Sequence, residues 1–302
     1  SFGHAAPAVS MSKLVLALWA AAESQCDFPV LSELSPADFR DRFYLQSPVV
    51  LRRGATSAAS AWTSGELGGR FGSVRVDSAK GGVVGRFGGD TQQEALGELL
   101  RSPSGWFVFD RGSRLFQEPE LVEGLAELSW PWLNRTAEEQ VWFASLSTSG
   151  TGANLHHHED GWAFIFEGAK LWFFYPPSDE LPIPRRDTLT MGQWHREVFQ
   201  VLSMGERPAT CRQEAGDLIY VPEGWWHATL HPEDVEGPSI GVAAQVKVAL
   251  TDRGKQWAAG AKTHTSDLAS WVSAASSIVA MVNRLGVVAL VAGVIWAAVV
   301  LR

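Results

Sequence analysis

Residues 154–177 read NLHHHEDGWAFIFEGAKLWFFYPP, and residues 216–230 read GDLIYVPEGWWHATL. The first stretch places three histidines, a glutamate and an aspartate at positions 156–160, directly before an apolar, aromatic strand pattern. The second places His227 after a strand pattern and a Pro/Gly turn. Side chains at i and i+2 of an extended chain point to the same side. Two ligands from one strand and a third from a distant one predict a facial metal site with open positions.

The spacing leaves three registers open for the first two ligands. The i, i+2 pairs are His156 with His158, His157 with Glu159, and His158 with Asp160. Each pair offers metal-binding groups on one side of an extended chain, so the spacing alone does not select among them.

Three motifs in order resemble the JmjC branch of the cupin-fold 2-oxoglutarate oxygenases. They are the HHHED cluster, Gly168-x-Lys170 followed by LWFFYPP, and the stretch GDLIYVPEGWWHATL. The resemblance is strongest over residues 141–246, extends more weakly back to about Cys26, and is greatest to a small member of the family from the endoplasmic reticulum lumen. It implies a double-stranded β-helix that binds Fe(II) and 2-oxoglutarate.

The resemblance also implies a choice of ligands. The family pattern is His-x-Asp/Glu, with the Gly-x-Lys motif about a dozen residues after the first ligand, and counting twelve residues back from Gly168 gives His156. The metal ligands are then His156, His158 and His227, with a histidine where the family has a carboxylate. Three neutral imidazoles suit Zn, Cu, Ni or a weaker iron site, so another divalent metal is an alternative to Fe(II). The register His158, Asp160 and His227 would restore the carboxylate.

Lys170 follows the histidines on the next strand pattern. The resemblance implies that its ammonium binds the distal carboxylate of 2-oxoglutarate, and a compact point charge in an aromatic-lined barrel suits that role. The alternative is a lysine at a strand edge whose ammonium reaches solvent. The neighbouring aromatics are predicted to wall the pocket or fill the core; they are Trp162, Trp172, Tyr175, Trp225 and Trp226. The remaining histidines are predicted to be surface or loop residues; they are His4, His195, His231 and His264.

Composition bounds the class of protein. The chain has 302 residues, 46% of them hydrophobic, with 14 Trp and 15 Phe, which is ample for the core of one large β domain. A net charge of -8, with no Lys/Arg run, argues against a nucleic-acid-binding protein.

The N-terminal part carries signals of the secretory pathway. Residues 11–22 combine Lys13, an apolar run and small residues, which is typical of a signal peptide, although a buried N-terminal helix is the alternative. Asn134 begins an N-glycosylation sequon. Cys26 and Cys211 are the only cysteines and are candidates for a disulfide in an oxidising compartment, with two unbonded buried thiols as the alternative.

The C-terminal part carries an apolar run. Residues 285–301 have no charged residue and would form a helix about 25 Å long, at the lower limit for a membrane span. The run predicts a transmembrane helix or a glycolipid-anchor signal, preceded by a linker over residues 249–284.

The rest of the chain is predicted to be mainly β with α additions. Ser35–Phe43 and Gln92–Leu100 are predicted helices, and the region around Trp194 is a third helical candidate. Short strands separated by Gly and Pro predict a jelly roll over residues 26–248, with helical elaborations in its N-terminal half. The predicted strands are residues 47–51, 106–110, 141–148, 162–166, 170–175, 216–221 and 239–246.

Two functions from different classes follow from the resemblance. The first is an Fe(II)- and 2-oxoglutarate-dependent oxygenase of the endoplasmic reticulum lumen, anchored by its C-terminal segment and acting on a protein or peptide. The second is a catalytically silent JmjC module that acts as a binding or scaffold protein. A cupin that only binds zinc or another divalent metal is a third reading, and homodimerisation is compatible with each.

Overall fold

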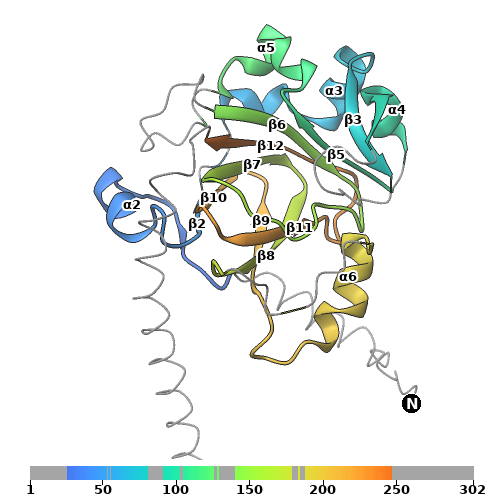
Figure 1. Cartoon of the computed structure of the whole chain (residues 1–302). Helices are drawn as coiled ribbons and strands as arrows, with labels where there is room; N and C mark the ends of the chain where they lie inside the picture. The colour runs from blue at the N-terminus through green and yellow to red at the C-terminus, as the bar shows by residue number, and fades with distance from the viewer. Residues whose placement is uncertain are drawn as a thin grey trace, which may run out of the picture. The chain divides into compact units, whose positions relative to one another are not determined.

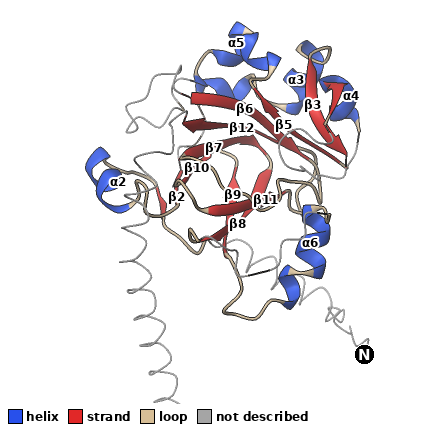
Figure 2. Ribbon diagram, in the orientation of Figure 1, coloured by secondary structure: helices blue, strands red, loops and turns tan. Residues whose placement is uncertain are grey.

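The computed structural model of the chain describes residues 26–52, 54, 56–80, 91–102, 105–125, 128, 140–178, 183 and 188–246. All of them lie in the first of the two units into which the chain divides, Ser1–Val248 and Ala249–Arg302. Two curved sheets face each other in this described part, and most of its short helices precede β6 in the chain (Figures 1 and 2).

The larger sheet has nine strands in the order β1-β2-β10-β7-β12-β6-β5-β3-β4. β1 and β2 pair in parallel, and the other neighbours are antiparallel. The strands are β1 (Val30–Leu31), β2 (Val49–Arg52), β3 (Arg75–Lys80), β4 (Gln92–Ala95), β5 (Trp106–Arg111), β6 (Gln140–Ser147), β7 (Gly161–Glu167), β10 (Asp217–Val221) and β12 (Ser239–Val246).

The smaller sheet has the order β11-β8-β9, and residues 151–156 extend it beyond β11. Its strands are β8 (Ala169–Tyr175), β9 (Ala209–Glu214) and β11 (Trp226–Leu230). From β6 onward the chain passes to residues 151–156 in the smaller sheet, returns to β7, crosses to β8 and β9, and then visits β10, β11 and β12. This alternation between two facing sheets is that of a jelly roll. The predicted double-stranded β-helix is confirmed.

β7 separates two packing environments. Trp162 and Phe164 pack in the core shared with the N-terminal part of the chain, which includes Trp62. The alternate residues Gly161 and Ala163 face the space between the two sheets, because successive side chains of a strand point to opposite faces. The bulky residues of β7 thus pack against the N-terminal part of the chain, and its small residues leave room inside the barrel.

Helices decorate the barrel as expected, with one exception. The predicted helix at Ser35–Phe43 is confirmed as α2 (Pro36–Arg42), where the Ser35 hydroxyl accepts from Asp38 N at 3.0 Å. The helical region around Trp194 is confirmed as α6 (Met191–Glu197). The other helices are α3 (Ser64–Arg70), α4 (Leu96–Arg101) and α5 (Pro119–Val122), with 3-10 turns at Ser57–Ser60, Arg114–Gln117 and Phe199–Val201.

The predicted helix at Gln92–Leu100 is wrong in its first half. Gln92–Ala95 forms β4 and pairs antiparallel with β3, and only Leu96–Arg101 is helical. Pairing with the preceding strand, β3, overrides the local helix propensity of these residues.

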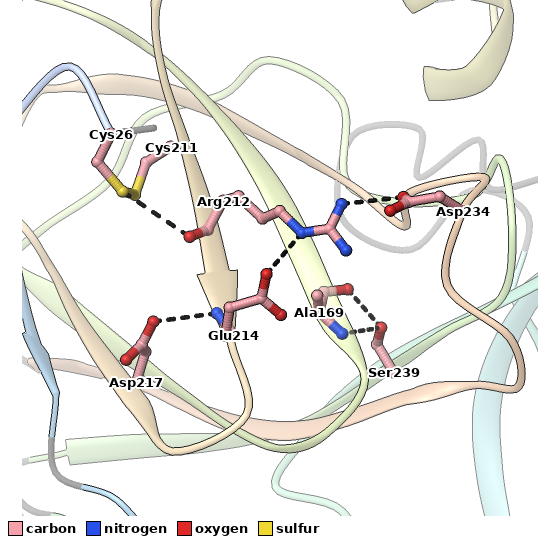
Figure 3. A network of polar contacts seen from close by, with 8 residues as sticks. All are labelled: Cys26, Ala169, Cys211, Arg212, Glu214, Asp217, Asp234 and Ser239. Atoms are coloured by element: carbon pink, nitrogen blue, oxygen red, sulfur yellow. Dashed lines mark hydrogen bonds and ion pairs between the residues drawn. A yellow bond between two sulfur atoms is a disulfide. The ribbon is translucent and has the colours of Figure 1, made fainter. Parts of the chain in front are cut away.

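A disulfide ties the start of the described chain to the smaller sheet. Cys26 and Cys211 are bonded, and Cys211 lies on β9 (Figure 3). Beside it, Arg212 donates to Glu214 at 2.6 Å and to Asp234 at 2.9 Å. Both acids are half exposed, so these ion pairs add little stability, whereas the disulfide restrains the segment before β1.

Several predicted features lie outside the described residues. Among the described residues, no helix is long and apolar enough to cross a membrane. The features outside are the signal peptide at 11–22, the sequon at Asn134, the linker at 249–284, the apolar run at 285–301, and two histidines, His4 and His264.

Candidate metal centre

The backbone pairing at the edge of the smaller sheet positions two of the predicted ligands. His156 N–H donates to the His227 carbonyl at 3.0 Å, and His227 N–H donates to the His156 carbonyl at 2.8 Å. The pairing continues along β11, where Thr229 N donates to Ala153 O at 3.0 Å. Opposed residues of an antiparallel pair project their side chains to the same face. Both imidazoles therefore point into the barrel from one β-pair.

His158 completes the cluster from two residues further along the chain. The ligand nitrogens of His156, His158 and His227 all lie within 4.8 Å of one another, and no other such group of three occurs among the described His, Cys, Asp and Glu residues. The ring centroid of His227 lies 4.2 Å from that of His156 and 4.6 Å from that of His158. In a tetrahedral site with metal–nitrogen bonds of about 2.1 Å, two ligand nitrogens lie about 3.4 Å apart, so the rings would have to close by up to about 1.4 Å to hold one ion.

Backbone carbonyls orient all three rings. A carbonyl oxygen only accepts hydrogen bonds, so a ring nitrogen next to it must carry the proton, and the metal-binding lone pair of the neutral ring is then on Nε2. The Nδ1 contacts are 2.7 Å from His156 to Asn154 O, 2.5 Å from His158 to Glu159 O, and 2.9 Å from His227 to Trp225 O. This outer support is the one that metal-binding histidines commonly have.

The electrostatics keep the rings of His158 and His227 neutral. Burial, and then the neighbouring His156 ring, lower the pKa of His158 to about 3. Burial is also the main cause that lowers the pKa of His227 well below its ordinary value. Neutral imidazole is the form that binds a metal ion, so these two rings are in the form that a ligand needs at neutral pH.

The structure brings together the first of the three registers. Asp160 is buried, but its carboxylate is not part of the cluster and does not line the cavity beside it. Glu159 also lies outside the cluster, and the exposed His157 ring packs on Trp226 with centroids 4.4 Å apart. The cluster therefore consists of three imidazoles with no carboxylate.

A cavity between the two sheets joins the histidines to Lys170. Its walls include small residues of the larger sheet, Gly161, Ala163 and Ala243, and the aromatic Trp172 of the smaller one. The small side chains explain why the barrel has space at this level. None of the described residues that line the cavity is Asp or Glu.

Lys170 is buried and points into this cavity. Its Nζ donates to the Ser145 hydroxyl and, at 3.3 Å, to the Ser145 carbonyl. Burial lowers its pKa to about 7, and no acidic residue contacts it within the described part of the chain. His227 lies opposite Phe174 on β8, and Lys170 is four residues along that strand, about 13 Å of chain. The histidines and Lys170 thus occupy different levels of one cavity.

Two histidines predicted to be surface or loop residues are in fact packed. His231 is fully buried, with Nδ1 2.8 Å from Pro232 O and Nε2 3.0 Å from Gly237 O. His195 is half-buried on α6, and its ring stacks on Phe199. Both histidines lie outside the three-histidine cluster. The structure therefore corrects the predicted exposure of these residues and does not add them to the candidate metal site.

The aromatics divide between cavity and core. Trp172 lines the cavity, and Trp162 packs in the core on the opposite face of β7. Tyr175 and Trp226 pack with α6 on the other side of the smaller sheet. Two polar residues outside the sequence motifs, Ser145 and Gln245, also line the cavity, together with Thr229 from the second motif. Only the two-residue alternation along their strands could have pointed to them.

Known proteins share parts of this sequence. JmjC domain-containing protein 8 from Mus musculus is 36% identical over 87 residues, which are 28% of this chain and 31% of that protein. The 2-oxoglutarate and iron-dependent oxygenase JMJD4 from Gallus gallus is 27% identical over 138 residues, or 40% of this chain and 32% of that protein. The matched part thus spans about a third of the length of these relatives. No family model matches the chain.

Among solved structures, the ribosomal oxygenase YcfD from Escherichia coli, in complex with cobalt and succinic acid, is similar to this chain. The two are 17% identical, with a TM-score of 0.47, and the match covers 73% of this chain and 53% of YcfD.

Proposed function

We propose that this chain, a relative of the JmjC-domain proteins, is an Fe(II)- and 2-oxoglutarate-dependent oxygenase. The observation that carries the proposal is the shared cavity, which holds three histidines at one level and the buried Lys170 side chain at another. A ligand that bridges a metal ion and a distant cation needs two anionic ends. 2-Oxoglutarate is such a molecule.

The burial of Lys170 is the strongest support for binding of 2-oxoglutarate in this cavity. Moving an ammonium out of water costs free energy, and two contacts to Ser145 replace only part of its hydration. An acidic protein side chain that would compensate it is absent from the described cavity wall. A carboxylate of a bound ligand would compensate the buried charge of Lys170.

The three histidines would hold the metal through Nε2. The carbonyl-bound Nδ1 atoms of all three rings and the lowered pKa values of His158 and His227 fit an oriented donor set. Imidazole binds iron as well as zinc, copper and nickel. When bound, the metal and 2-oxoglutarate supply the oxidative chemistry, in which oxidative decarboxylation of the keto acid to succinate accompanies hydroxylation of an aliphatic C–H bond.

The chain's own residues would position 2-oxoglutarate and shield the reacting centre from water. Lys170 would fix the far carboxylate of the keto acid, and Ser145 holds the lysine in place. Trp172 and Ala163 form apolar wall beside this site, which excludes water from the reacting centre. No general base is required, since the cofactor carries the reaction.

The setting of this activity is also part of the proposal. The signal at residues 11–22, the sequon at Asn134 and the disulfide between Cys26 and Cys211 support a secretory protein, and residues 285–301 support attachment to a membrane. We place the protein in the endoplasmic reticulum lumen, as a homodimer or a monomer, with a protein or peptide as its substrate. The charge of -8 does not favour nucleic acid.

One observation favours the second candidate, a catalytically silent binding or scaffold protein. The cluster has His158 where the family it resembles has a carboxylate ligand, and Asp160 does not replace it. Three neutral ligands leave a bound dication less compensated than two histidines and a carboxylate do. A site that binds only zinc would have the same three histidines.

Succinate formation tests the proposal. The purified chain is incubated with Fe(II), ascorbate and 2-oxoglutarate, and succinate is measured for the wild type and for His227→Ala and Lys170→Met. Loss of a ligand is expected to reduce succinate formation by more than about 100-fold, beyond the effect of losing an outer-shell contact. Lys170→Met should raise the 2-oxoglutarate concentration needed for half-maximal rate.

Matched controls use residues of the same type outside the cavity. His157→Ala removes an exposed neighbour of the ligands, and Lys80→Met removes a lysine whose side chain is 71% exposed. Both should behave as the wild type. Folded protein that binds zinc but neither binds nor consumes 2-oxoglutarate would reject the oxygenase in favour of a metal-binding or scaffold role.

A further inference from the structure

Thr229 has a hydroxyl proton that the protein itself does not use. The residue lies two positions after His227 on β11, and both side chains line the cavity. Thr229 Oγ1 accepts a hydrogen bond from Ala153 N at 3.1 Å, and it donates to no acceptor among the described residues. A hydroxyl has one proton and two lone pairs, so this contact leaves the proton available. Thr229 can therefore hold the backbone of the neighbouring segment and still donate to a ligand.

The pairing of β11 with β8 places this hydroxyl near Lys170. Thr229 lies opposite Trp172 in the antiparallel register, and Lys170 is two residues from Trp172 on β8. Thr229 and Lys170 are thus diagonal neighbours on one face, with Cα atoms about 7–8 Å apart, a separation that long side chains bridge. Along β11, Thr229 stands between the level of His227 and the level of Lys170.

This end of the cavity offers hydrogen-bond donors and no carboxylate. Lys170 Nζ donates to the Ser145 hydroxyl, which keeps its own proton, and Thr229 adds a second hydroxyl. None of the described residues that line the cavity is Asp or Glu. The two oxygens of a carboxylate accept several hydrogen bonds at once, so one carboxylate can accept from the ammonium and from a hydroxyl together. The donor set suits a carboxylate better than a neutral group.

We propose that the Thr229 hydroxyl donates a hydrogen bond to the distal carboxylate of 2-oxoglutarate and makes the site selective for keto acids that carry this second carboxylate. The inference rests on the proposed function, in which Lys170 binds the same group. A hydrogen bond to a charged acceptor strengthens binding by about tenfold or more. A residue that only holds residues 151–156 in place would instead affect every ligand of the cavity to the same extent.

The test compares two keto acids on the full chain loaded with Co(II), by titration calorimetry. The second keto acid is 2-oxopentanoate, which has the same carbon chain as 2-oxoglutarate and a methyl group in place of the distal carboxylate. Thr229→Val keeps the branched shape and removes the hydroxyl. It should raise the Kd of 2-oxoglutarate by about tenfold or more and change that of 2-oxopentanoate by less than about twofold. Thr229→Ser keeps the hydroxyl and should keep the preference for 2-oxoglutarate.

Thr148→Val is the matched control. Thr148 is also buried, and its Oγ1 accepts from Trp106 N at 3.3 Å, but it is not among the residues that line the cavity. Like Thr229→Val, this variant loses a hydroxyl that is bonded to a backbone amide. It should melt at a lower temperature and keep the preference for 2-oxoglutarate. The Kd of Co(II) is measured for each variant, because Thr229→Val also removes the acceptor of Ala153 N.

An unchanged preference in folded Thr229→Val would overturn the inference and leave the proposed function standing. Equal weakening of both keto acids, or loss of the preference in Thr229→Ser, would overturn it as well, because the hydroxyl would then have only a structural role. Thr229→Ala takes the place of Thr229→Val if the valine variant does not fold, and it should lose the preference in the same way. A wild-type cobalt protein that binds no 2-oxoglutarate would reject the proposed function and the inference with it.

Discussion

His156 and His227 are bound to each other through both of their backbone amides, at 3.0 and 2.8 Å, although they are far apart in the sequence. The pair sets the separation of their Cα atoms by β-sheet geometry instead of by loop conformation. A metal site on paired strands is held more rigidly than one on loops. The precision of the candidate centre therefore depends on the contact between residues 151–156 and β11.

Gly152 is where this contact is most sensitive to substitution. A Cβ at this position would lie 1.9 Å from the Thr229 carbonyl oxygen, so Gly152→Ala must push the segment away from β11. We expect a lower melting temperature and a Zn(II) affinity reduced by about 10–100-fold, as for the loss of an outer-shell support, although no ligand is changed. Calorimetric titration with Zn(II) measures this. Gly205→Ala, which meets no atom within 4 Å, should change neither property, and an unaltered Gly152→Ala would contradict the role of the contact.

Lys170 should lower the stability of the ligand-free protein at neutral and acidic pH. Burial lowers its pKa from 10.5 to about 7, so the unfolded chain binds the extra proton between these values, and stability must rise with pH across that window. Below pH 7 both states are charged and the cost of burial is complete. Lys170→Met should therefore stabilise the protein at pH 6 by on the order of a few kcal/mol, with a smaller gain at pH 9.

Urea unfolding at both pH values measures this difference. Lys80→Met provides the comparison, since the Lys80 side chain is 71% exposed and forms an ion pair with Glu94. It should change stability little at either pH. Equal effects of Lys170→Met at pH 6 and pH 9 would show that the lysine does not titrate in this window.

2-Oxoglutarate binding should depend on pH through the same residue. A carboxylate binds the charged form of Lys170, whose pKa is about 7 without ligand, so binding raises that pKa and takes up a proton above pH 7. Affinity for the cobalt protein should then fall by up to about tenfold per pH unit above 7. Titration calorimetry in buffers of different ionisation enthalpy counts the proton. Lys170→Arg stays charged and should lose the dependence, whereas proton uptake by this variant would assign the effect to another group.

The disulfide should contribute strongly to stability. Cys26 and Cys211 are 185 residues apart, and closing a loop of that length stabilises a chain by up to about 5 kcal/mol in the loop-entropy estimate. Adding a reductant should lower the melting temperature of the wild type. The variant with both cysteines changed to alanine should melt lower and be insensitive to reductant, so a shift in that variant would point to a different cause.

The sequence predicted most strands of the barrel because their signals are local. Residues of β6, β7, β8, β10 and β12 are apolar runs of strand length separated by Gly, Pro or polar turns. Ser35 and the proline after it likewise fix the start of α2. β4 was missed because its residues favour a helix, and only pairing with β3 makes them a strand.

The polar lining of the cavity could not be predicted in the same way. Gln245 and Ser145 stand on different strands, in no motif, and become neighbours of the site only when β6 and β12 pair. His231 resembles a loop histidine in sequence, yet it is fully buried between carbonyls of its own turn. Burial of single polar residues depends on what packs over them, and local sequence does not carry that information.

The sequence by itself determined the kinds of ligand available, since HHHED and a distant histidine in strand patterns already predicted a metal site. It left three registers open because every i, i+2 pair of an extended chain has the same local geometry. The family resemblance favoured His156 and His158 by their distance from Gly168, but only the tertiary structure brings these two rings together with His227. The backbone pair between His156 and His227 fixes which face of the segment points into the barrel, and a shift by one residue would turn every side chain to the other face.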